Sequence, residues 1–415
     1  MTESHQSDGD KILDIYLQLS VLLTSIGATA YEVTICLSKL SSVITFPLVH
    51  LSPLPNTISL SLKYKSKFYT AIARFEQQPT NAGLLTHIEK KFFTVQKTNQ
   101  PLSTVFQQIM QLSQQPLRPW LCALAACIIQ CFATCRFFGG DWAASFGTAG
   151  AAFISFITFR YFEKNKLNLL LLDSVVAFLS GIVAILIGSA LLSQTPLAML
   201  FASIIWLVPG MAMMNSFSDL FHGFISSALH NFAKAWMIIF SLLLGLIPAL
   251  MQVTNLTVAL AISPWQDWFW AGLASLACAY RFEAIGKLLL SSFFLGAIGH
   301  GLRAVWILQL GYDPVTATFI AALGVGIAIA IIFWHNPLIL AYAATIGIIP
   351  LVPGAALLRA FHDLLHIAQQ GTYATSLEIT QGISISLQAI TEVIALAVGS
   401  ILPTTFFRWL IRFKY

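Results

Sequence analysis

The sequence contains few charged residues for its length. Only 9% of its 415 residues are Asp, Glu, Lys or Arg, whereas 57% are hydrophobic, and the mean hydropathy is +0.79. Soluble domains carry about 25% charged residues. This deficit excludes an ordinary soluble domain and indicates an integral membrane protein whose main surroundings are the lipid bilayer.

Other absences narrow the function. The N-terminal segment "MTESHQSDGDK" has no apolar run, so we expect no secretory signal. The sequence has no Walker-type loop and no dinucleotide fingerprint, so ATP drive is unsupported and no cofactor is expected. Lys and Arg form no dense stripe, so we expect no nucleic-acid partner. Three of the six cysteines, Cys127, Cys131 and Cys135, share one helical face, which we interpret as helix packing rather than a soft-metal site.

The charged residues that are present divide the chain. Residues 1–118 hold 17 of the 39 charged side chains, and the Pro-containing junction "QQPLRPW" (114–120) ends this part. We therefore predict a cytoplasmic N-terminal domain at 1–118. Its amphipathic stretch 12–44 suggests two helices that meet near Gly27, and alternation within 56–75 suggests a β-hairpin, so the domain is expected to be a small α+β unit.

After residue 118 the apolar stretches form two sets of five. The first set lies near 119–138, 142–161, 168–190, 196–214 and 235–253, and the second near 265–281, 287–309, 314–333, 337–357 and 382–403. The sets align at a spacing of about 144 residues, which predicts two five-helix membrane repeats at 119–258 and 259–415. An odd number of spans per repeat gives the halves opposite orientations. The predicted fold is therefore a polytopic α-helical membrane protein with about ten transmembrane helices in a 5+5 inverted repeat.

The distribution of Lys and Arg predicts which loops of this arrangement face the cytoplasm. With the N-terminus inside, the cytoplasmic loops and C-terminus collect nine basic residues and the outer side three, as the positive-inside rule requires. The inner set is Arg160, Lys164, Lys166, Lys234, Arg281, Lys287, Arg408, Arg412 and Lys414, and the outer set is Arg136, Arg303 and Arg359. We predict a multi-pass protein of the cell inner (plasma) membrane with both termini in the cytoplasm.

One interrupted segment occurs twice at matching places. "LVPGMAMMNSFSDLFH" (207–222) and "LVPGAALLRAFHDLLH" (351–366) are identical at nine of sixteen positions. Proline breaks a helix, glycine permits close approach to the backbone, and the N-terminus of a restarted helix attracts an anion such as a carboxylate. Paired breaks in corresponding halves indicate a transport site, with a simple kink as the alternative. The predicted substrate-binding residues are Pro209, Gly210, Asn215, Asp219, Pro353, Gly354 and Arg359.

Two acids are candidates for proton coupling. Asp363 occupies the place of Asp219 in the second copy, and Glu392 lies midway along the last apolar stretch. An ionisable residue at such depth is costly and therefore suggests a function. The competing interpretations are a solvated or capping position for Asp363 and a structural pair between Glu392 and Arg303.

The segment "HDLLH" (362–366) resembles the H-E-x-x-H pattern of zinc proteases. Its counterpart "SDLFH" lacks the first His, and duplication already explains the shared Asp and second His. We therefore predict no metal site. An intramembrane metal-dependent hydrolase using "HDLLH", and a non-transporting membrane sensor or scaffold, are the alternative functions.

The sequence resembles the threonine/serine exporters along nearly its whole length. "LLTSIGATAYEV" (22–33), "HLSPLPNTISLSL" (50–62) and "RFEQQPTNAGLL" (74–85) are similar to that family's opening module. "LVPGMAMMNSFSDLFHG" and "IPLVPGAALLRAFHDLL" (349–365) are similar to its two membrane modules. The chain departs from the family pattern at Tyr31-Glu32-Val33, where Arg-Val-Glu is usual, and at Ser52-Pro53-Leu54, where Thr-Pro-Thr is usual.

The resemblance implies an exporter of small hydroxylated amino acids that is driven by the proton gradient, and hence not an enzyme. Its expected partners are a small amino-acid substrate, protons and the lipid bilayer. With the paired breaks, the resemblance predicts a secondary transporter that works by alternating access.

Overall fold

The computed structural model describes residues 8–44, 48–54, 56–64, 67–98, 101–115, 118–165, 167–253, 262–334, 336 and 339–412. The N-terminal elements are α1 (Asp8–Ser25), α2 (Ala30–Ile44), β1 (Leu48–Leu54), β2 (Thr57–Tyr64), β3 (Lys67–Arg74), α3 (Ala82–Thr98) and α4 (Leu102–Ser113). The first half of the remaining chain forms α5 (Trp120–Phe137), α6 (Trp142–Lys164), α7 (Leu169–Ala190), α8 (Pro196–Ile204), η1 (Ile205–Leu207), α9 (Gly210–Phe221) and α10 (Ile225–Leu250). The second half forms α11 (Pro264–Arg281), α12 (Gly286–Leu308), α13 (Pro314–Ile332), α14 (Leu340–Ile348), η2 (Ile349–Leu351), α15 (Gly354–Gln370), η3 (Gly371–Tyr373) and α16 (Ser376–Arg412).

The N-terminal part combines four helices with a three-stranded antiparallel sheet in the order β1-β2-β3. The hairpin predicted within 56–75 is present, because β2 pairs with β3 from Thr57↔Arg74 to Tyr64↔Lys67. Alternate residues of β2 are buried toward the helices, namely Ile58, Leu60 and Leu62. The strand β1 was not predicted by alternation and adds a third strand to the hairpin.

The membrane part consists of long apolar helices. In the described part of the chain, seven helices are long and apolar enough to cross a bilayer, and the bent pair 196–207 and 210–221 would make eight. The seven are α5, α6, α7, α10, α12, α13 and α16. The chain is thus a polytopic α-helical membrane protein. Each of the ten predicted segments overlaps helical structure, but α11 is not apolar enough and the apolar helix 342–351 is too short to count as a span, so the number ten stays a prediction.

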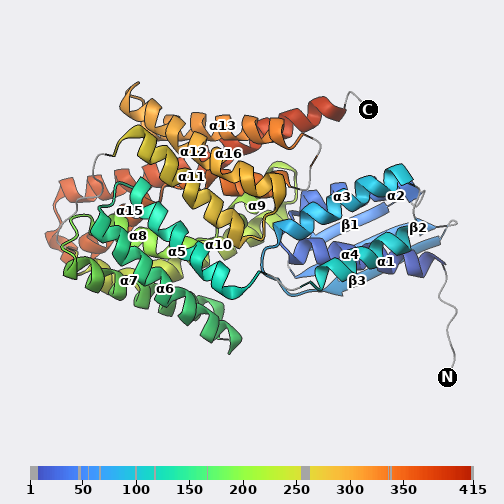
Figure 1. Cartoon of the computed structure of the whole chain (residues 1–415), viewed down its shortest axis with the longest axis horizontal. Coiled ribbons are helices and arrows are strands. Elements are labelled where there is room, and N and C mark those ends of the chain that lie inside the picture. Colours follow the sequence, from blue (N-terminus) through green and yellow to red (C-terminus); the bar gives the residue numbers. More distant parts are fainter. Residues whose placement is uncertain are drawn as a thin grey trace.

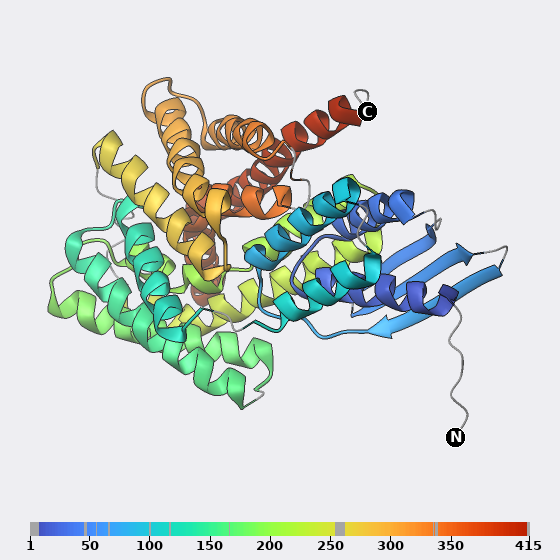
Figure 2. The ribbon, with the colours of Figure 1, turned by 45° about the vertical axis from the view of Figure 1, so that its right-hand side comes forward.

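The N-terminal part lies at one end of the helical bundle, and the C-terminal end of α16 points to the same end (Figure 1; Figure 2). Arg118 fixes the junction. Its guanidinium donates to the carbonyl oxygens of Tyr280 and Ala284, each at 2.6 Å, and lies 3.7 Å from the Glu283 carboxylate. These bonds attach the start of the membrane part to the turn after α11. The predicted repeat boundary at 258/259 and the predicted inner cations Lys166 and Lys414 lie outside the described residues.

Close helix packing depends on small residues. A Cβ atom on Gly296 of α12 would lie 2.1 Å from Ser275 Oγ of α11, and one on Gly245 of α10 would lie 2.2 Å from the Ser174 carbonyl oxygen of α7. The thiols of Cys127, Cys131 and Cys135 are unoxidised and buried in the apolar cluster between the first-half helices. Their environment agrees with the packing interpretation.

We predict that Gly245→Val destabilises the protein by about 1–3 kcal/mol, because an added side chain must push α7 away from α10. Thermal unfolding in detergent measures the loss. Leu244→Val is the matched control, since Leu244 is 58% exposed on the same helix and should change the unfolding temperature little. Equal effects of the two substitutions would contradict this account of the α7–α10 contact.

Candidate functional site

The first break replaces one helical turn by a tight backbone turn at proline. Helix α8 ends at Ile204 and continues as η1, and α9 restarts at Gly210. Between them Pro209 has φ −80° and ψ 56°, and the Gly210 N–H donates to the Val208 carbonyl at 2.8 Å. These are the dihedral angles and the hydrogen bond of an inverse γ-turn. The flanking helices are bent by 66°.

The second break has the same backbone geometry. Pro353 has φ −77° and ψ 56°, the Gly354 N–H donates to the Val352 carbonyl at 2.7 Å, and α15 begins at Gly354. In both copies the glycine N–H is used by the turn itself. A ligand at either break would therefore meet the next N–H groups of the first helical turn, which have no intrahelical acceptor.

Each break packs against a helix from the opposite half of the chain. A Cβ on Gly354 would lie 1.6 Å from the Phe201 ring of α8, whereas a Cβ on Gly210 would lie 3.7 Å from Thr345 Cγ2 of α14. Accordingly α8 contacts α15 and α14 contacts α9. This reciprocal arrangement brings Pro209, Gly210, Pro353 and Gly354 into one central region, although they are 144 residues apart in sequence.

The first break lines a cavity that faces the N-terminal part, which we call the proximal cavity. Its volume is about 330 Å³. The membrane helices contribute Pro209, Gly210, Asn215 and Lys234, and the N-terminal part contributes Gly27 and Gln78, among others.

The turn between α1 and α2 forms hydrogen bonds with the polar side chains that follow the first break. The Asn215 amide donates to the Gly27 carbonyl at 2.9 Å, and the Tyr31 N–H donates to the Asp219 carboxylate at 3.3 Å. The Tyr31 ring stacks on His222 with 3.4 Å between ring centroids. Asp219 is fully buried and also accepts from Ser227 Oγ at 2.6 Å.

The same turn also contacts the second half of the chain. The Tyr342 hydroxyl of α14 donates to the Ile26 carbonyl. Gly27 has φ +103°, a conformation that favours glycine, and a Cβ there would lie 2.9 Å from the Tyr342 hydroxyl oxygen. The α1–α2 turn therefore connects both halves at the proximal end. Asn215 was predicted as a substrate-binding residue. Its Oδ1 atom is buried and has no hydrogen-bond partner among the described residues.

The second break lines a cavity at the other end of the bundle, which we call the distal cavity. Its volume is about 500 Å³, and its wall includes Pro353 and Ala356 after the break. It also includes Phe138 and Gly139 at the end of α5, Pro264 at the start of α11, and Gln309 at the end of α12. These ends lie opposite the N-terminal part, because α5 begins beside it at Trp120 (Figure 1).

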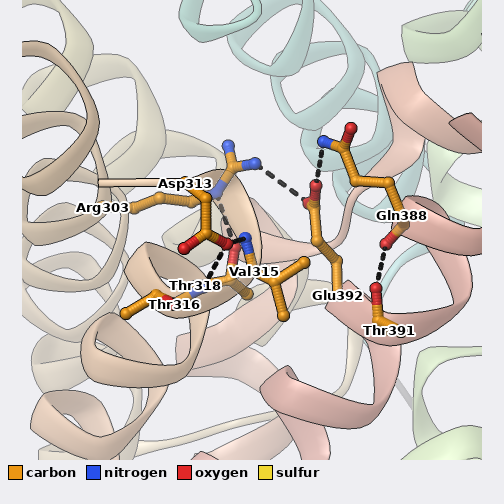
Figure 3. Close-up of polar contacts among 8 residues, drawn as sticks. All are labelled: Arg303, Asp313, Val315, Thr316, Thr318, Gln388, Thr391 and Glu392. Atoms are coloured by element: carbon orange, nitrogen blue, oxygen red, sulfur yellow. Dashed lines mark hydrogen bonds and ion pairs between the residues drawn. The ribbon is translucent and has the colours of Figure 1, made fainter. Parts of the chain in front are cut away.

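Glu392 is paired in the wall of this cavity. Arg303 donates from one terminal nitrogen to Glu392 Oε2 at 3.0 Å and from Nε to Thr318 Oγ1 at 2.8 Å, while Gln388 donates to Glu392 Oε1 at 2.7 Å (Figure 3). The pair connects α12, α13 and α16. The structure thus contains the Arg303–Glu392 contact that was the alternative to a free proton-carrying acid.

The remaining predicted residues are not gathered at a cavity. Arg359 is exposed on α15, and Asp363 lies beside its neighbour His362, with 3.2 Å between His362 Nδ1 and Asp363 Oδ1. Asp363 therefore differs from the buried Asp219 in spite of the matching sequence, because the N-terminal part covers only the proximal end. The His362 and His366 rings are 6.4 Å apart, and the described residues contain no group of three or more His, Cys, Asp or Glu side chains placed to hold a metal ion.

Three ionisable residues near the breaks were not proposed as site residues. Arg281 of α11 donates to Gln130 Oε1 at 2.7 Å and to the Trp206 carbonyl beside the first break at 3.2 Å. Asp267 and His300 form a buried contact of 2.8 Å in the distal cavity. The spacing of His300 and Arg303, three apart on one apolar helix, was the sequence signal for a shared polar face.

Long apolar helices with two matching breaks, and ionisable side chains buried among them, define a polytopic α-helical membrane protein. The chain belongs to the threonine/serine exporter family. Residues 14–254 match the family model described as "Putative threonine/serine exporter", and residues 267–406 match the one described as "Threonine/Serine exporter, ThrE".

The chain is similar to proteins named as a threonine/serine exporter and to proteins named as succinate transporter subunits. A probable threonine/serine exporter of Mycobacterium tuberculosis is 22% identical over 382 residues, which cover 84% of this chain and 69% of the relative. A probable succinate transporter subunit of Escherichia coli is 24% identical over 240 residues, covering 56% and 91%, and that of Klebsiella aerogenes is 18% identical over 249 residues, covering 60% and 96%. No solved structure matches the chain.

We predict that Gly354→Ala disrupts the crossing of the two halves and lowers the yield of folded protein severalfold, because its Cβ would overlap the Phe201 ring. Gly210→Ala is the matched control, since its Cβ would make only ordinary contact with Thr345. Size-exclusion chromatography in detergent measures the folded fraction. Phe201→Ala should partly rescue Gly354→Ala, and failure of that rescue would show that the ring is not the obstacle.

Proposed function

We propose that the protein is a secondary active transporter that exports threonine, serine or similar small amino acids by proton antiport, with alternating access at the paired broken helices. The observation that carries the proposal is the repetition of one backbone break, with each copy lining a cavity at a different end of the bundle. Alternating access requires a central site that two entrances reach in turn, and inverted repeats supply such a pair of entrances.

The arrangement of helices supports the ten-span inverted repeat with domains at 1–118, 119–258 and 259–415. The α8–α9 pair begins at the distal end and α9 finishes beside the N-terminal part, whereas the α14–α15 pair begins at the proximal end with Tyr342 and continues to the distal cavity wall. The two broken pairs thus run in opposite directions. We place the protein in the inner membrane with both termini in the cytoplasm, and the common placement of the N-terminal part and the end of α16 supports the part of this proposal that puts both on one side of the membrane (Figure 1).

In this mechanism the substrate-binding residues are those beside the breaks. Asn215 Oδ1, which has no hydrogen-bond partner among the described residues, would accept a hydrogen bond from an ammonium or hydroxyl group of the substrate. Asp219 becomes available when the α1–α2 turn withdraws, and the substrate carboxylate would meet the first turn of α9 or α15. Arg359, Asp363 and Glu392 keep their proposed roles, the latter two as proton-coupling acids.

Succinate is the second candidate solute, since two relatives are named as probable succinate transporter subunits. A dicarboxylate and an amino acid share one carboxylate and differ in the charge of the other end. The transport assay must therefore include both.

We predict that vesicles loaded with labelled threonine or serine and containing the purified protein lose label faster when the outside is more acidic. Parallel vesicles carry alanine and succinate, and vesicles without a pH gradient give the uncoupled rate. The Asp219→Asn and Glu392→Gln variants should slow efflux by roughly tenfold or more, because each removes a buried charge from the pathway.

Glu163→Gln is the control for these variants, since Glu163 is exposed at the end of α6. Normal efflux by both Asp219→Asn and Glu392→Gln would contradict the proposed roles of these acids in substrate binding and proton coupling. Efflux of succinate but not of amino acids would show that the substrate is a dicarboxylate rather than an amino acid.

A further inference from the structure

We infer that the distal cavity is a binding site for a zwitterionic α-amino acid, in which Arg303 takes the carboxylate, Asp267 takes the ammonium, and His300 accepts the proton that expels it. This inference rests on the proposed function and deepens it by naming the residues and the charge type of the substrate. A volume of about 500 Å³ is within the range of small-molecule sites.

The wall of the cavity contains two acid–base pairs. Arg303 and Glu392 form one pair, and His300 and Asp267 form the other. His300 and Arg303 lie one turn apart on α12, a spacing of about 5–6 Å between Cβ atoms. A single amino acid, with its carboxylate and ammonium on one carbon, can therefore contact both pairs.

Arg303 is the group that an incoming carboxylate meets. Its side chain is 20% exposed, whereas the Glu392 side chain is 1% exposed, so the guanidinium lies on the cavity side of the pair. It contacts Glu392 through one terminal nitrogen rather than in a bidentate fork (Figure 3). Its other terminal nitrogen has no partner among the described residues and can donate to a second carboxylate.

Asp267 is the group that suits an ammonium. Its Oδ2 contacts His300 Nδ1 at 2.8 Å, and its Oδ1 has no hydrogen-bond partner among the described residues. In the tautomer whose Nδ1–H donates to this carboxylate, a neutral imidazole carries its lone pair on Nε2. The His300 ring also packs 4.8 Å from the Phe137 ring, which limits its rotation.

The formal charges of the cavity select against a dicarboxylate. With His300 neutral, two carboxylates face one guanidinium, and the cavity carries a single net negative charge. A zwitterion adds no net charge and places its ammonium beside Asp267, whereas a dianion adds two negative charges to a site that is already negative. The distal cavity therefore favours an amino acid over succinate.

Proton uptake at His300 competes with the substrate. When Nε2 binds a proton from the distal side, the imidazolium neutralises Asp267 and repels the ammonium, and the amino acid leaves. On this inference His300, rather than Asp363 or Glu392, carries the coupled proton. The proton is released at the proximal side after the cavity changes its access, so one proton moves inward as one amino acid moves outward.

Other charged or titratable groups on the elements around α12 are held elsewhere. Arg136 of α5 donates to the Gly140 carbonyl and lies over the Trp142 ring, Asp313 before α13 accepts from the Val315 and Thr316 N–H groups, and Tyr342 of α14 bonds to Ile26 at the proximal end. On α11, Arg281 contacts Gln130 and Trp206. On α12 itself, Lys287 donates to the Ile332 carbonyl at the proximal end.

The decisive experiment measures binding of labelled serine to the purified full-length protein at about pH 7.5 and about pH 5.5, which span the range where histidine changes charge. Wild-type protein should bind serine roughly tenfold more weakly at the lower pH. His300→Gln should bind serine equally at both values, because the amide cannot take up the proton. A His300→Gln protein that keeps the wild-type pH dependence overturns the inference.

Ligand analogues test the two ends of the substrate. Threoninol, which lacks the carboxylate, and 3-hydroxybutyrate, which lacks the ammonium, should each compete with serine at least tenfold more weakly than threonine does. Arg303→Lys, which keeps the charge opposite Glu392, should narrow the difference between threonine and threoninol. Equal competition by succinate and threonine contradicts the charge argument.

Cysteine protection locates the bound molecule. In a Cys122→Ser background, Ala304→Cys places a thiol in the wall of the distal cavity, and Leu310→Cys places one on the exposed turn beyond α12. Serine should slow modification of the first by an anionic thiosulfonate and leave the second unchanged. Serine transport without such protection refutes the distal site alone, whereas absence of any amino-acid binding or transport refutes the proposed function as well.

Discussion

The whole arrangement depends on the cost of leaving a polar group without a partner in an apolar bundle. A helix satisfies its own backbone, but a break in the helix exposes donors and acceptors. At both breaks the inverse γ-turn uses the glycine N–H, and at the first break Arg281 also donates to the Trp206 carbonyl. Two buried acids follow the same constraint, since Asp219 accepts a hydrogen bond from the Tyr31 N–H and Glu392 accepts hydrogen bonds from Arg303 and Gln388.

This constraint explains which features the sequence predicts well. Pro209–Gly210 and Pro353–Gly354 are local signals, because proline and glycine alter the backbone wherever they occur in a helix. The helices themselves follow from apolar runs, and the β2–β3 hairpin follows from alternation. The pairing of Arg303 with Glu392 was foreseeable as one of two interpretations, because two opposite charges in an apolar domain gain by meeting.

The rest depended on tertiary contacts that no local pattern contains. Nothing in residues 22–33 shows that the α1–α2 turn would place the Gly27 carbonyl on Asn215 and the Tyr31 ring on His222. Asp267 lies in the first turn of a helix of modest apolarity, and only the fold places it against His300 of the next helix. Arg281 appeared in the sequence as a loop charge, and only the fold brings its guanidinium to the first break.

The asymmetry between the two ends has a mechanistic consequence. At the proximal end one turn contacts both halves of the bundle, through Asn215 of α9 and Tyr342 of α14. Any widening of that end must break these bonds or move the N-terminal part together with both halves. At the distal end the charged pairs lie directly in the cavity wall. In the proposed transport cycle, the N-terminal part would control access from its own side, and the charged pairs of the distal cavity would control release on the other.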